Sequence, residues 1–325
     1  MSLLKITDLS KRFPVKGGVL KRTLGEVHAV DRVSLTLEAG ETLGIVGESG
    51  CGKSTLGKTL LQLTEVTDGR IEFEGVDITH RSRRALLPFR RDAQMVFQDA
   101  YEALNARHNV ARILSEPFEI HGMPGPHDDR VLALLARVGL GADAFHRYPH
   151  EFSGGQRQRI GIARAIALAP KLLVCDEPVS ALDVSVQSQI MNLLMDLQRE
   201  RNLGMLFIAH DLAVVKHLSH RIAVMYLGQI VEVGPGDALF KRPKHPYTRA
   251  LIDAIPVIDP DQAQPLKPLE GDVPSPINRP NGCAFASRCR FATDACRQTR
   301  PVLGPVDDKH QVACIRADEI DLSAF

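Results

Sequence analysis

Tryptophan is absent from this sequence, and aromatic residues make up only 5% of its 325 positions. A protein that stacks bases of single-stranded nucleic acid needs aromatic side chains on its surface, so the composition argues against that class. An excess of charge of one sign is also missing, because 40 Lys and Arg balance 39 Asp and Glu, for a formal net charge of +1. A near-neutral chain lacks the basic field typical of nucleic-acid-binding proteins. We therefore expect no nucleic-acid partner.

Long apolar runs are missing as well. A helix that spans a bilayer needs about 20 consecutive apolar residues, and the most apolar stretches, residues 165–175 and 222–228, are much shorter. The first residues, MSLLKITDLSKRF, lack the basic-then-apolar pattern of a secretory signal. We expect a cytosolic chain that acts at a membrane, if at all, through partners.

Hydrophobic residues make up 44% of the chain, which is enough to bury a sizeable core. Residues 3–45 alternate between apolar and polar positions, the period of partly exposed strands, with a loop expected at 16–26. Residues 100–150 are expected to be mostly helical. From residue 151 onward, buried strands alternate with helices, and this rhythm predicts a mainly parallel sheet covered on both faces.

The composition changes after about residue 255. Residues 256–282 are rich in proline and do not favour regular helix, so they are expected to form a linker or a wrapping arm. Four of the six cysteines follow, at Cys283, Cys289, Cys296 and Cys314. In a reducing compartment, such clustering favours metal ligation over disulfides.

The densest pattern is the loop GESGCGKS, from Gly47 to Ser54, which matches G-x-x-x-x-G-K-[ST]. It lies between an expected buried strand and an expected helix, the context that this motif requires. Its glycines allow backbone N–H groups to face phosphate oxygens, and the helix dipole adds positive potential. Lys53 is expected to reach the β- and γ-phosphates and Ser54 to bind Mg²⁺. The thiol of Cys51 has no expected role beyond its backbone.

Two carboxylates end the apolar strand that precedes Pro178. Ligands of open α/β sheets gather at the carboxyl ends of strands, so Asp176 is expected to hold Mg²⁺, directly or through water. The adjacent Glu177 points another way on an extended chain and is expected to take a proton from the attacking water. His210 follows another apolar strand and is expected to contact a γ-phosphate. The alternative for His210 is a structural or solvated histidine.

A second glycine pair, Gly154 and Gly155, opens a further helix. Ser153 is a good N-cap residue, and Gln156 three positions later completes a capping box. The uncovered amides form a second anion site, one more than a single nucleotide requires. Two explanations stay open at this point: the pattern only caps the helix, or it binds a nucleotide held by another subunit.

Six motifs occur in the order found in the ATP-binding subunits of ABC transporters, and the chain resembles that family over about residues 1–255. The motifs are GESGCGKST at 47–55, VFQD at 96–99, FSGGQRQR at 152–159, LLVCDEP at 172–178, SALD at 180–183 and IAHD at 208–211. The resemblance implies an α/β fold of the P-loop NTPase type. Its parts would be a RecA-like parallel-sheet core, an antiparallel β subdomain and a helical subdomain at about residues 99–165.

The resemblance also implies roles at the motif positions. Two ATPase subunits of that family bind two ATP molecules head to tail, so the Ser153 turn would cap the γ-phosphate of ATP on the partner's phosphate loop. Asp183 would act across the dimer seam, and Gln98 would sense Mg²⁺ and the attacking water. Glu177 would be the base, and His210 would orient the γ-phosphate. The positions implied to contact nucleotide are Phe13, which would stack on adenine, and Gly47, Ser49, Gly50, Cys51, Gly52, Lys53, Ser54, Thr55, Gln98, Ser153, Gly154, Gly155, Gln156, Asp176 and Asp183.

The tail resembles that of peptide-importer ATPases, on the segments HPYT at 245–248 and GDVPSP at 271–276. Members of this group can bind a [4Fe–4S] cluster with their tail cysteines. The spacing here, C-x₅-C-x₆-C-x₁₇-C, is by itself compatible with such a cluster or with four-cysteine zinc. The lack of a tight C-x₂₋₄-C pair favours the larger cluster, and free thiols are the remaining alternative. We predict a nucleotide-binding domain at 1–255 and a proline-rich arm with a small cysteine-rich extension at 256–325.

Together these resemblances imply an ATP-hydrolysing subunit of an importer for dipeptides or oligopeptides. The expected partners are a second, similar ATPase in a head-to-tail heterodimer, two membrane-spanning permease subunits and, indirectly, an external substrate-binding protein. The expected location is the cytoplasmic face of the inner membrane. The alternatives are a related cargo, such as nickel, an opine, haem or another peptide-like solute, and an ABC ATPase unrelated to transport.

Overall fold

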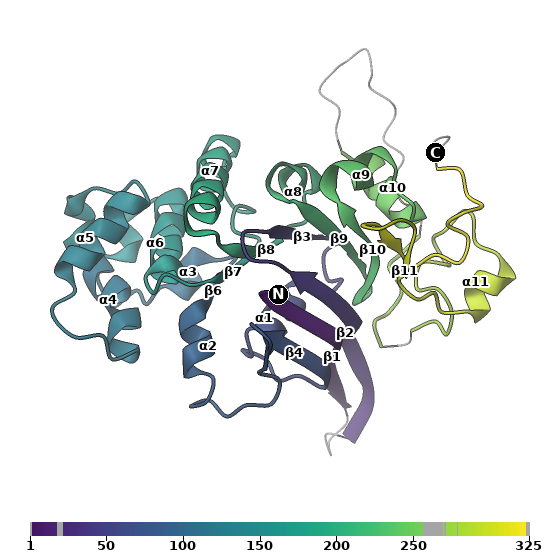
Figure 1. Ribbon diagram of the computed structural model, residues 1–325, viewed down its shortest axis with the longest axis horizontal. Helices are drawn as coiled ribbons and strands as arrows, with labels where there is room; N and C mark the ends of the chain where they lie inside the picture. The colour runs from purple at the N-terminus through teal and green to yellow at the C-terminus, as the bar shows by residue number, and fades with distance from the viewer. Residues whose placement is uncertain (1, 18–21, 256–268, 270, 278, 323–325) are drawn as a thin grey trace, which may run out of the picture. The chain divides into compact units, whose positions relative to one another are not determined.

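The computed structural model describes residues 2–17, 22–255, 269, 271–277 and 279–322 (Figure 1). The start of the predicted proline-rich arm, residues 256–268, lies outside the described residues. The chain forms two units, and each is described by itself. The first unit comprises Met1–Lys5, Thr36–Thr42 and Glu72–Ile208, and the second comprises Ile6–Leu35, Leu43–Ile71 and Ala209–Phe325.

The first unit contains three parallel strands. β6 (Ala93–Val96) pairs with β7 (Leu172–Asp176), and β7 pairs with β8 (Gly204–Ile208). Every residue of β7 and of β8 is buried. Continuous buried strands of this kind are typical of a parallel sheet covered on both faces. The sequence prediction of buried parallel strands is therefore confirmed.

Helices separate the strands of the first unit along the chain. They are α2 (Leu87–Asp92), α3 (Ala100–Ala103), α4 (Val110–Ile120), α5 (Asp128–Arg137), the 3₁₀ helices η1 (Ala142–His146) and η2 (Pro149–Glu151), α6 (Gly154–Ile166) and α7 (Val184–Arg201). Figure 1 shows α4, α5 and α6 side by side, and these three helices contact one another. The interval between β6 and β7 is thus occupied by a helical bundle.

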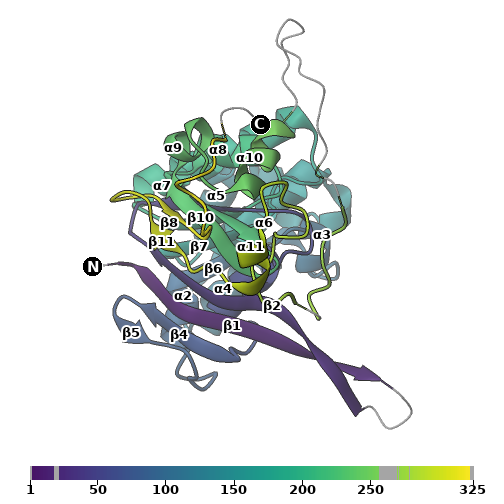
Figure 2. The same ribbon diagram turned by 90° about the vertical axis from the view of Figure 1, so that its right-hand side faces the viewer.

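The N-terminal strands belong mainly to the second unit. β2 (Arg22–Leu37), β1 (Leu4–Gly17) and β4 (Asp68–Phe73) are neighbours in that order, and Figure 2 shows β1 and β2 as two long strands side by side. The last residues of β4 pair antiparallel with β5 (Val76–Asp77) in the first unit. The loop predicted at 16–26 was placed too widely, because β1 reaches Gly17 and β2 begins at Arg22. Pairing satisfies the backbone groups of both strands even where their side chains show no apolar alternation.

A second sheet of this unit carries the phosphate loop. β3 (Thr42–Val46) pairs in parallel with β9 (Arg221–Tyr226), and β9 pairs antiparallel with β10 (Gln229–Pro235). Two short strands from the tail, β12 (Gln311–Val312) and β11 (Gly304–Pro305), extend the sheet antiparallel beyond β10. The tail is therefore part of the same sheet as the strand that precedes the phosphate loop.

The helices of the second unit are shorter. They are α1 (Lys53–Leu60), α8 (Leu212–Leu218), α9 (Gly236–Lys241), α10 (Pro246–Asp253) and α11 (Asp294–Gln298). Across the described ranges of both units, none of the helices combines the length and the apolar character that a membrane crossing demands.

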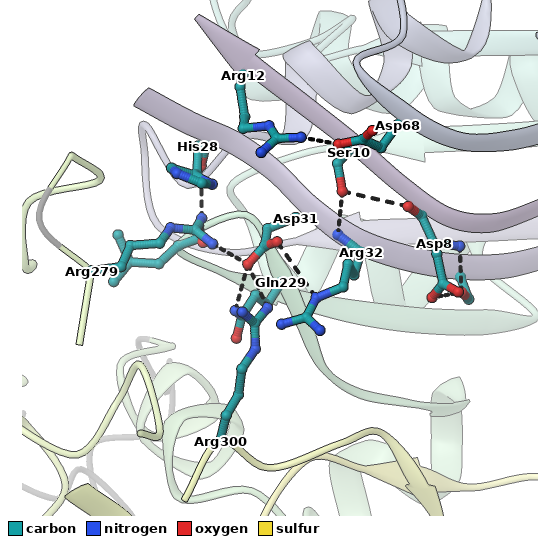
Figure 3. Close-up of polar contacts among 12 residues, drawn as sticks. Asp8, Ser10, Arg12, His28, Asp31, Arg32, Asp68, Gln229, Arg279 and Arg300 are labelled. Atoms are coloured by element: carbon teal, nitrogen blue, oxygen red, sulfur yellow. Dashed lines mark hydrogen bonds and ion pairs between the residues drawn. The ribbon is translucent and has the colours of Figure 1, made fainter. Parts of the chain in front are cut away.

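An ion-pair cluster fastens the tail to β2 (Figure 3). The carboxylate of Asp31 accepts hydrogen bonds from Gln229, at 2.9 Å, and from the guanidinium groups of Arg279 and Arg300. Arg279 also donates to the carbonyl oxygen of His28 at 2.7 Å. Although burial raises the pKa of Asp31, the bonds from Gln229 and Arg300 and the charge of Arg279 hold it below its usual value. Arg279, in the described part of the predicted arm, is therefore held against β2.

A buried carboxylate fastens the tail to β10. Glu232 is fully buried and accepts hydrogen bonds from the backbone N–H groups of Lys244, at 2.6 Å, and His245, at 3.0 Å. Its third partner is Nε2 of His310, at 2.7 Å. Because a buried carboxylate is stable only with such partners, Glu232 fixes both segments against β10.

Candidate active site

The phosphate loop follows buried β3 directly and runs into α1, the context that the motif requires. Gly52 has a φ of +109°, and a Cβ atom there would lie 2.0 Å from the carbonyl oxygen of Ala29. Gly47 has a φ of +154°, and its Cβ would lie 2.1 Å from the carbonyl oxygen of Met225. Only glycine fits at either position, so the loop conformation is set by close backbone approach as well as by backbone dihedrals.

Lys53 begins α1 and its side chain lies inside the loop. It is only 4% exposed, and its Nζ donates to the carbonyl oxygens of Gly47, at 2.7 Å, and of Glu48, at 3.1 Å. Ser54 and Thr55 follow in the first turn of α1. The thiol of Cys51 is buried, and burial raises its pKa, so it is a neutral packing group rather than a reactive one.

The two carboxylates lie at the end of β7 in the first unit. Asp176 is the last residue of the strand and is 2% exposed. Glu177 follows with a φ of +45°, a left-handed conformation that is unfavourable for a residue with a side chain. Its N–H donates to the carbonyl oxygen of Ile208 at 2.9 Å, and this bond helps to hold the strained turn.

The structure brings Gln98 and Glu177 together. Val96, at the end of β6, pairs in register with Cys175 of β7, so the residues that follow both strands emerge at the same edge. Nε2 of Gln98 donates to Oε2 of Glu177 at 3.0 Å. A half-buried carboxylate held by an amide at a strand end is positioned to accept a proton from a substrate.

The glycine pair of the first unit opens α6, and the predicted capping box is confirmed. The hydroxyl of Ser153 accepts the N–H of Gln156 at 3.3 Å, and the Gln156 side chain accepts the N–H of Ser153 at 3.0 Å. Ser153 and Gly154 are exposed, whereas Gly155 packs on α7, where a Cβ would lie 2.4 Å from Cγ1 of Val186. Asp183 is the exposed N-cap of α7.

Phe13 and His210 are both in the second unit. Phe13 projects from β1 with 39% exposure, and Nζ of Lys11 lies 4.9 Å from the centre of its ring. An exposed aromatic on a strand is available for stacking. His210 is exposed and precedes Asp211, which caps α8 through the N–H groups of Ala213 and Val214.

The predicted site residues divide between the two units. The first unit holds Gln98, Ser153, Gly154, Gly155, Gln156, Asp176, Glu177 and Asp183. The second holds Phe13, Gly47, Ser49, Gly50, Cys51, Gly52, Lys53, Ser54, Thr55, His210 and the four tail cysteines. Within the first unit the structure joins Gln98 to Glu177, and within the second it encloses Lys53 in the phosphate loop.

The four tail cysteines line a single cavity. Cys283, Cys289, Cys296 and Cys314 share it with apolar neighbours that include Phe285. Burial raises the pKa of Cys283 to about 11, and the other three cysteines add to the increase. In the part of the chain that the structure describes, however, no group of three or more His, Cys, Asp or Glu side chains is arranged to hold a metal ion. The bound cluster stays a prediction.

Sequence reasoning missed two residues from later in the chain that support the phosphate loop. Arg288 forms an ion pair with Glu48, and the hydroxyl of Tyr247 accepts the N–H of Glu48 at 2.8 Å. One signal was available, because an acidic residue inside a loop for an anionic ligand calls for a cationic partner. Nothing local indicated which of the 40 Lys and Arg residues would supply it.

A glycine-rich loop between a buried strand and a helix, with an Asp–Glu pair ending a parallel strand, defines a P-loop ATPase. Comparisons with known proteins identify the family within this class. The model of the ABC transporter family matches residues 30–180. The model of the oligopeptide/dipeptide transporter C-terminal region matches residues 231–296.

The chain is 54% identical to a probable peptide ABC transporter ATP-binding protein of Sinorhizobium fredii, over 96% of this chain and 89% of that protein. It is 49% identical to the oligopeptide transport ATP-binding protein OppF of Salmonella typhimurium, over 98% and 97% of the two chains. The dimeric post-hydrolysis structure of the ATP-binding cassette MJ0796 bound to ADP and Pi superposes with a TM-score of 0.64 at 26% identity, over 71% of this chain and 98% of that one.

The chain therefore belongs to the family of ABC transporter ATP-binding proteins that carry the oligopeptide/dipeptide transporter C-terminal region. Its activity is ATP hydrolysis coupled to transport, and the predicted α/β P-loop fold is confirmed.

Proposed function

We propose that this chain is the ATP-hydrolysing subunit of an ABC importer that powers uptake of dipeptides or oligopeptides across the inner membrane. One observation carries the proposal: a complete phosphate loop and a peptide-transporter tail occur in one chain. Residues 1–255 would form the nucleotide-binding domain, with its helical subdomain at about 99–165. Residues 256–325 would form the arm and the four-cysteine extension.

Hydrolysis joins a water oxygen to the γ-phosphorus of ATP while the bond from that phosphorus to the β–γ bridging oxygen breaks and ADP departs. In this proposal Glu177 accepts the proton of the attacking water, and Gln98 orients the carboxylate through its 3.0 Å hydrogen bond. Lys53 binds the β- and γ-phosphates, and His210 orients the γ-phosphate. Phe13 stacks on the adenine.

Mg²⁺ fits the oxygen donors that the chain offers. The carboxylate of Asp176, the hydroxyl of Ser54 and the amide oxygen of Gln98 are the ligand types that this ion prefers, and we assign it to them. When bound, Mg²⁺ neutralises charge on the β- and γ-phosphate oxygens.

The exposed turn at Ser153 and Gly154 supports a two-subunit site. In the proposed head-to-tail pair, this turn and Asp183 face the nucleotide on the partner's phosphate loop, and the partner is a similar but different ATPase. Two membrane-spanning permeases bind the pair at the cytoplasmic face of the membrane, and an external binding protein delivers the cargo. Closure of the ATPases around two nucleotides would switch the access of the permeases.

The four tail cysteines are proposed to hold a [4Fe–4S] cluster, with zinc as the alternative. Their support is that all four line one apolar cavity and that the other three cysteines add to the raised pKa of Cys283. Four sulfur donors in an apolar site fit either metal centre. A bound metal cation would favour the thiolate form of its cysteine ligands. The centre would have a structural or regulatory role.

Deletion of the gene tests the cargo. We expect loss of uptake of labelled dipeptides and tripeptides, restored by the wild-type chain but not by Glu177→Gln. The matched control is Glu200→Gln, which removes a surface carboxylate that pairs with Arg137, and it should restore uptake. Loss of nickel, opine or haem uptake with intact peptide uptake would favour the alternative cargo, and intact uptake of every solute would contradict a transport role.

A further inference from the structure

Glu48 is the second residue of the phosphate loop, and its carboxylate carries a negative charge next to the place where a polyphosphate binds. Arg288, from the cysteine-rich tail, binds this carboxylate with both ends of its guanidinium group. Nη1 lies 2.7 Å from Oε2 and Nη2 lies 3.1 Å from Oε1. The Arg288 side chain is only 5% exposed and the Glu48 side chain is 26% exposed, so the pair is partly shielded from water. Bidentate arginine–carboxylate pairs of this kind are strong and geometrically specific.

The backbone of Glu48 is fixed at two further points. Its N–H donates to the hydroxyl of Tyr247, a fully buried residue at the start of α10, and its carbonyl oxygen accepts Nζ of Lys53. A tail arginine, a residue of the HPYT segment and the phosphate-binding lysine therefore all meet at Glu48. Movement of this one residue would alter both the charge and the shape of the loop.

Arg288 and Tyr247 each adjoin residues that line the cysteine cavity. Between Cys283 and Cys289 the chain makes two tight turns, in which Cys283 accepts the N–H of Ala286 and Phe285 accepts the N–H of Arg288. Arg288 directly precedes Cys289, so ligation of the cysteines would fix its backbone. Phe285 lines the cavity and packs against Tyr247, with ring centres 5.4 Å apart.

We propose that Arg288 is a positioning residue of the phosphate loop, which neutralises and holds Glu48 and so makes ATP affinity depend on the state of the four-cysteine cavity. The dependence on the cavity rests on the proposed metal centre, whereas the action of Arg288 on Glu48 does not. Without Arg288, the carboxylate of Glu48 would repel the phosphates of ATP, and removing that carboxylate as well would relieve the repulsion.

A double-mutant cycle tests the action of Arg288 on Glu48. ATP affinity is measured by calorimetry on the full chain for wild type, Arg288→Ala, Glu48→Gln and the double variant, with circular dichroism to verify folding. We expect Arg288→Ala to weaken binding about tenfold or more, as for other buried charge pairs, and the double variant to recover most of that loss. Arg288→Lys keeps the positive charge but cannot form the two-pronged guanidinium contact. Its ATP affinity should lie between those of wild type and Arg288→Ala.

Arg297→Ala is the matched control, because Arg297 also adjoins a tail cysteine but is 59% exposed and pairs only on the surface. It should bind ATP as wild type does. Equal affinity of Arg288→Ala and wild type would overturn the proposal, as would a double variant as weak as Arg288→Ala.

Cys289→Ser tests the link to the cavity. We expect it to weaken ATP binding in the wild-type background and to have little effect in the Glu48→Gln background, where no repulsive carboxylate is left to be released. An equal loss in both backgrounds would mean general destabilisation and would overturn the link. If the purified chain holds neither iron nor zinc while the Arg288–Glu48 cycle behaves as expected, then the proposed metal centre fails and the positioning role stands.

Discussion

Gln98 donates a hydrogen bond to Glu177 over 3.0 Å, although 79 residues separate them in the sequence. The contact exists because β6 and β7 are parallel and in register, so their carboxyl ends release both residues at one edge. The backbone of Glu177 is left-handed, with a φ of +45°. Strain at a residue held so firmly is typical of a functional position.

Replacing Glu177 with Gln removes the proposed proton acceptor while keeping the shape and an amide that can still contact Gln98. We expect turnover to fall by about 10²–10⁴, the usual contribution of a general base, with ATP affinity unchanged. Steady-state hydrolysis by the assembled transporter and equilibrium ATP binding measure the two effects. Glu200→Gln serves as the surface control, and wild-type turnover in Glu177→Gln would exclude Glu177 as the base.

Lys53→Ala removes the buried ammonium from the phosphate loop. Because this group is the main positive charge inside the loop, we expect ATP affinity to fall at least tenfold, measured by calorimetry with Mg²⁺ present. Lys58→Ala, an exposed lysine one turn further along α1, is the matched control and should bind normally. Normal binding by folded Lys53→Ala would remove the lysine from the proposed nucleotide site.

Gly154→Asp probes the proposed two-subunit site. A Cβ there meets its nearest neighbour, Cδ2 of Leu182, at 3.4 Å, and an acidic residue is favourable in a first helical turn, so the chain should fold. The new carboxylate would face the γ-phosphate on the partner, and we expect it to prevent the closed pair that Glu177→Gln otherwise traps with ATP. Gel filtration with ATP compares Glu177→Gln with and without Gly154→Asp and shows whether the closed pair forms. Unimpaired pairing would argue that this turn only caps α6.

Asp31→Asn loosens the tail by removing the charge that Arg279 and Arg300 share. We expect a loss of roughly 2 kcal/mol in the free energy of unfolding at pH 7, typical of a charge-assisted hydrogen bond. The pKa of Asp31 is lowered in the folded chain, so the folded state binds this proton less tightly than the unfolded state. Its stabilisation is therefore complete above pH about 4 and is lost as pH falls through the lower folded value.

Urea unfolding at a series of pH values checks this. The difference in the free energy of unfolding between wild type and Asp31→Asn should become smaller as the pH is lowered below about 4. Asp196→Asn, at an exposed position of α7, should show no such difference. A difference independent of pH would mean that the charge of Asp31 is not what holds the arm.

If the four tail cysteines hold the proposed iron–sulfur cluster, the protein absorbs visible light. Purified without oxygen, the chain should show broad sulfur-to-iron absorption and contain iron, and Cys289→Ser should lose both. Zinc without colour would select the alternative metal. A chelator that removes the metal should lower the midpoint temperature of thermal unfolding, because metal binding to the folded state adds to its stability. A colourless and metal-free wild-type chain would leave only the free-thiol alternative.

Patterns that span a few positions were readable from the sequence. The phosphate loop, the capping box at Ser153 and the apolar strand before Asp176 depend on neighbours within about four residues. Their geometry follows from local dihedrals and hydrogen bonds, and the structure reproduces it. The extent of β1 and β2 was not readable, because pairing with another strand, rather than side-chain alternation, carries β1 to Gly17 and starts β2 at Arg22.

The sequence by itself thus determined the class of site, the identity of its motif residues and the presence of four tail cysteines. Only the tertiary structure decided that Arg288 meets Glu48 across 240 residues, that Arg279 and Arg300 converge on Asp31, and that Glu232 binds His310. The physical reason is that an ion pair needs two charges in one place, and each arginine or acid is locally indistinguishable from its many equivalents. Which of them meet is decided by the path of the folded chain.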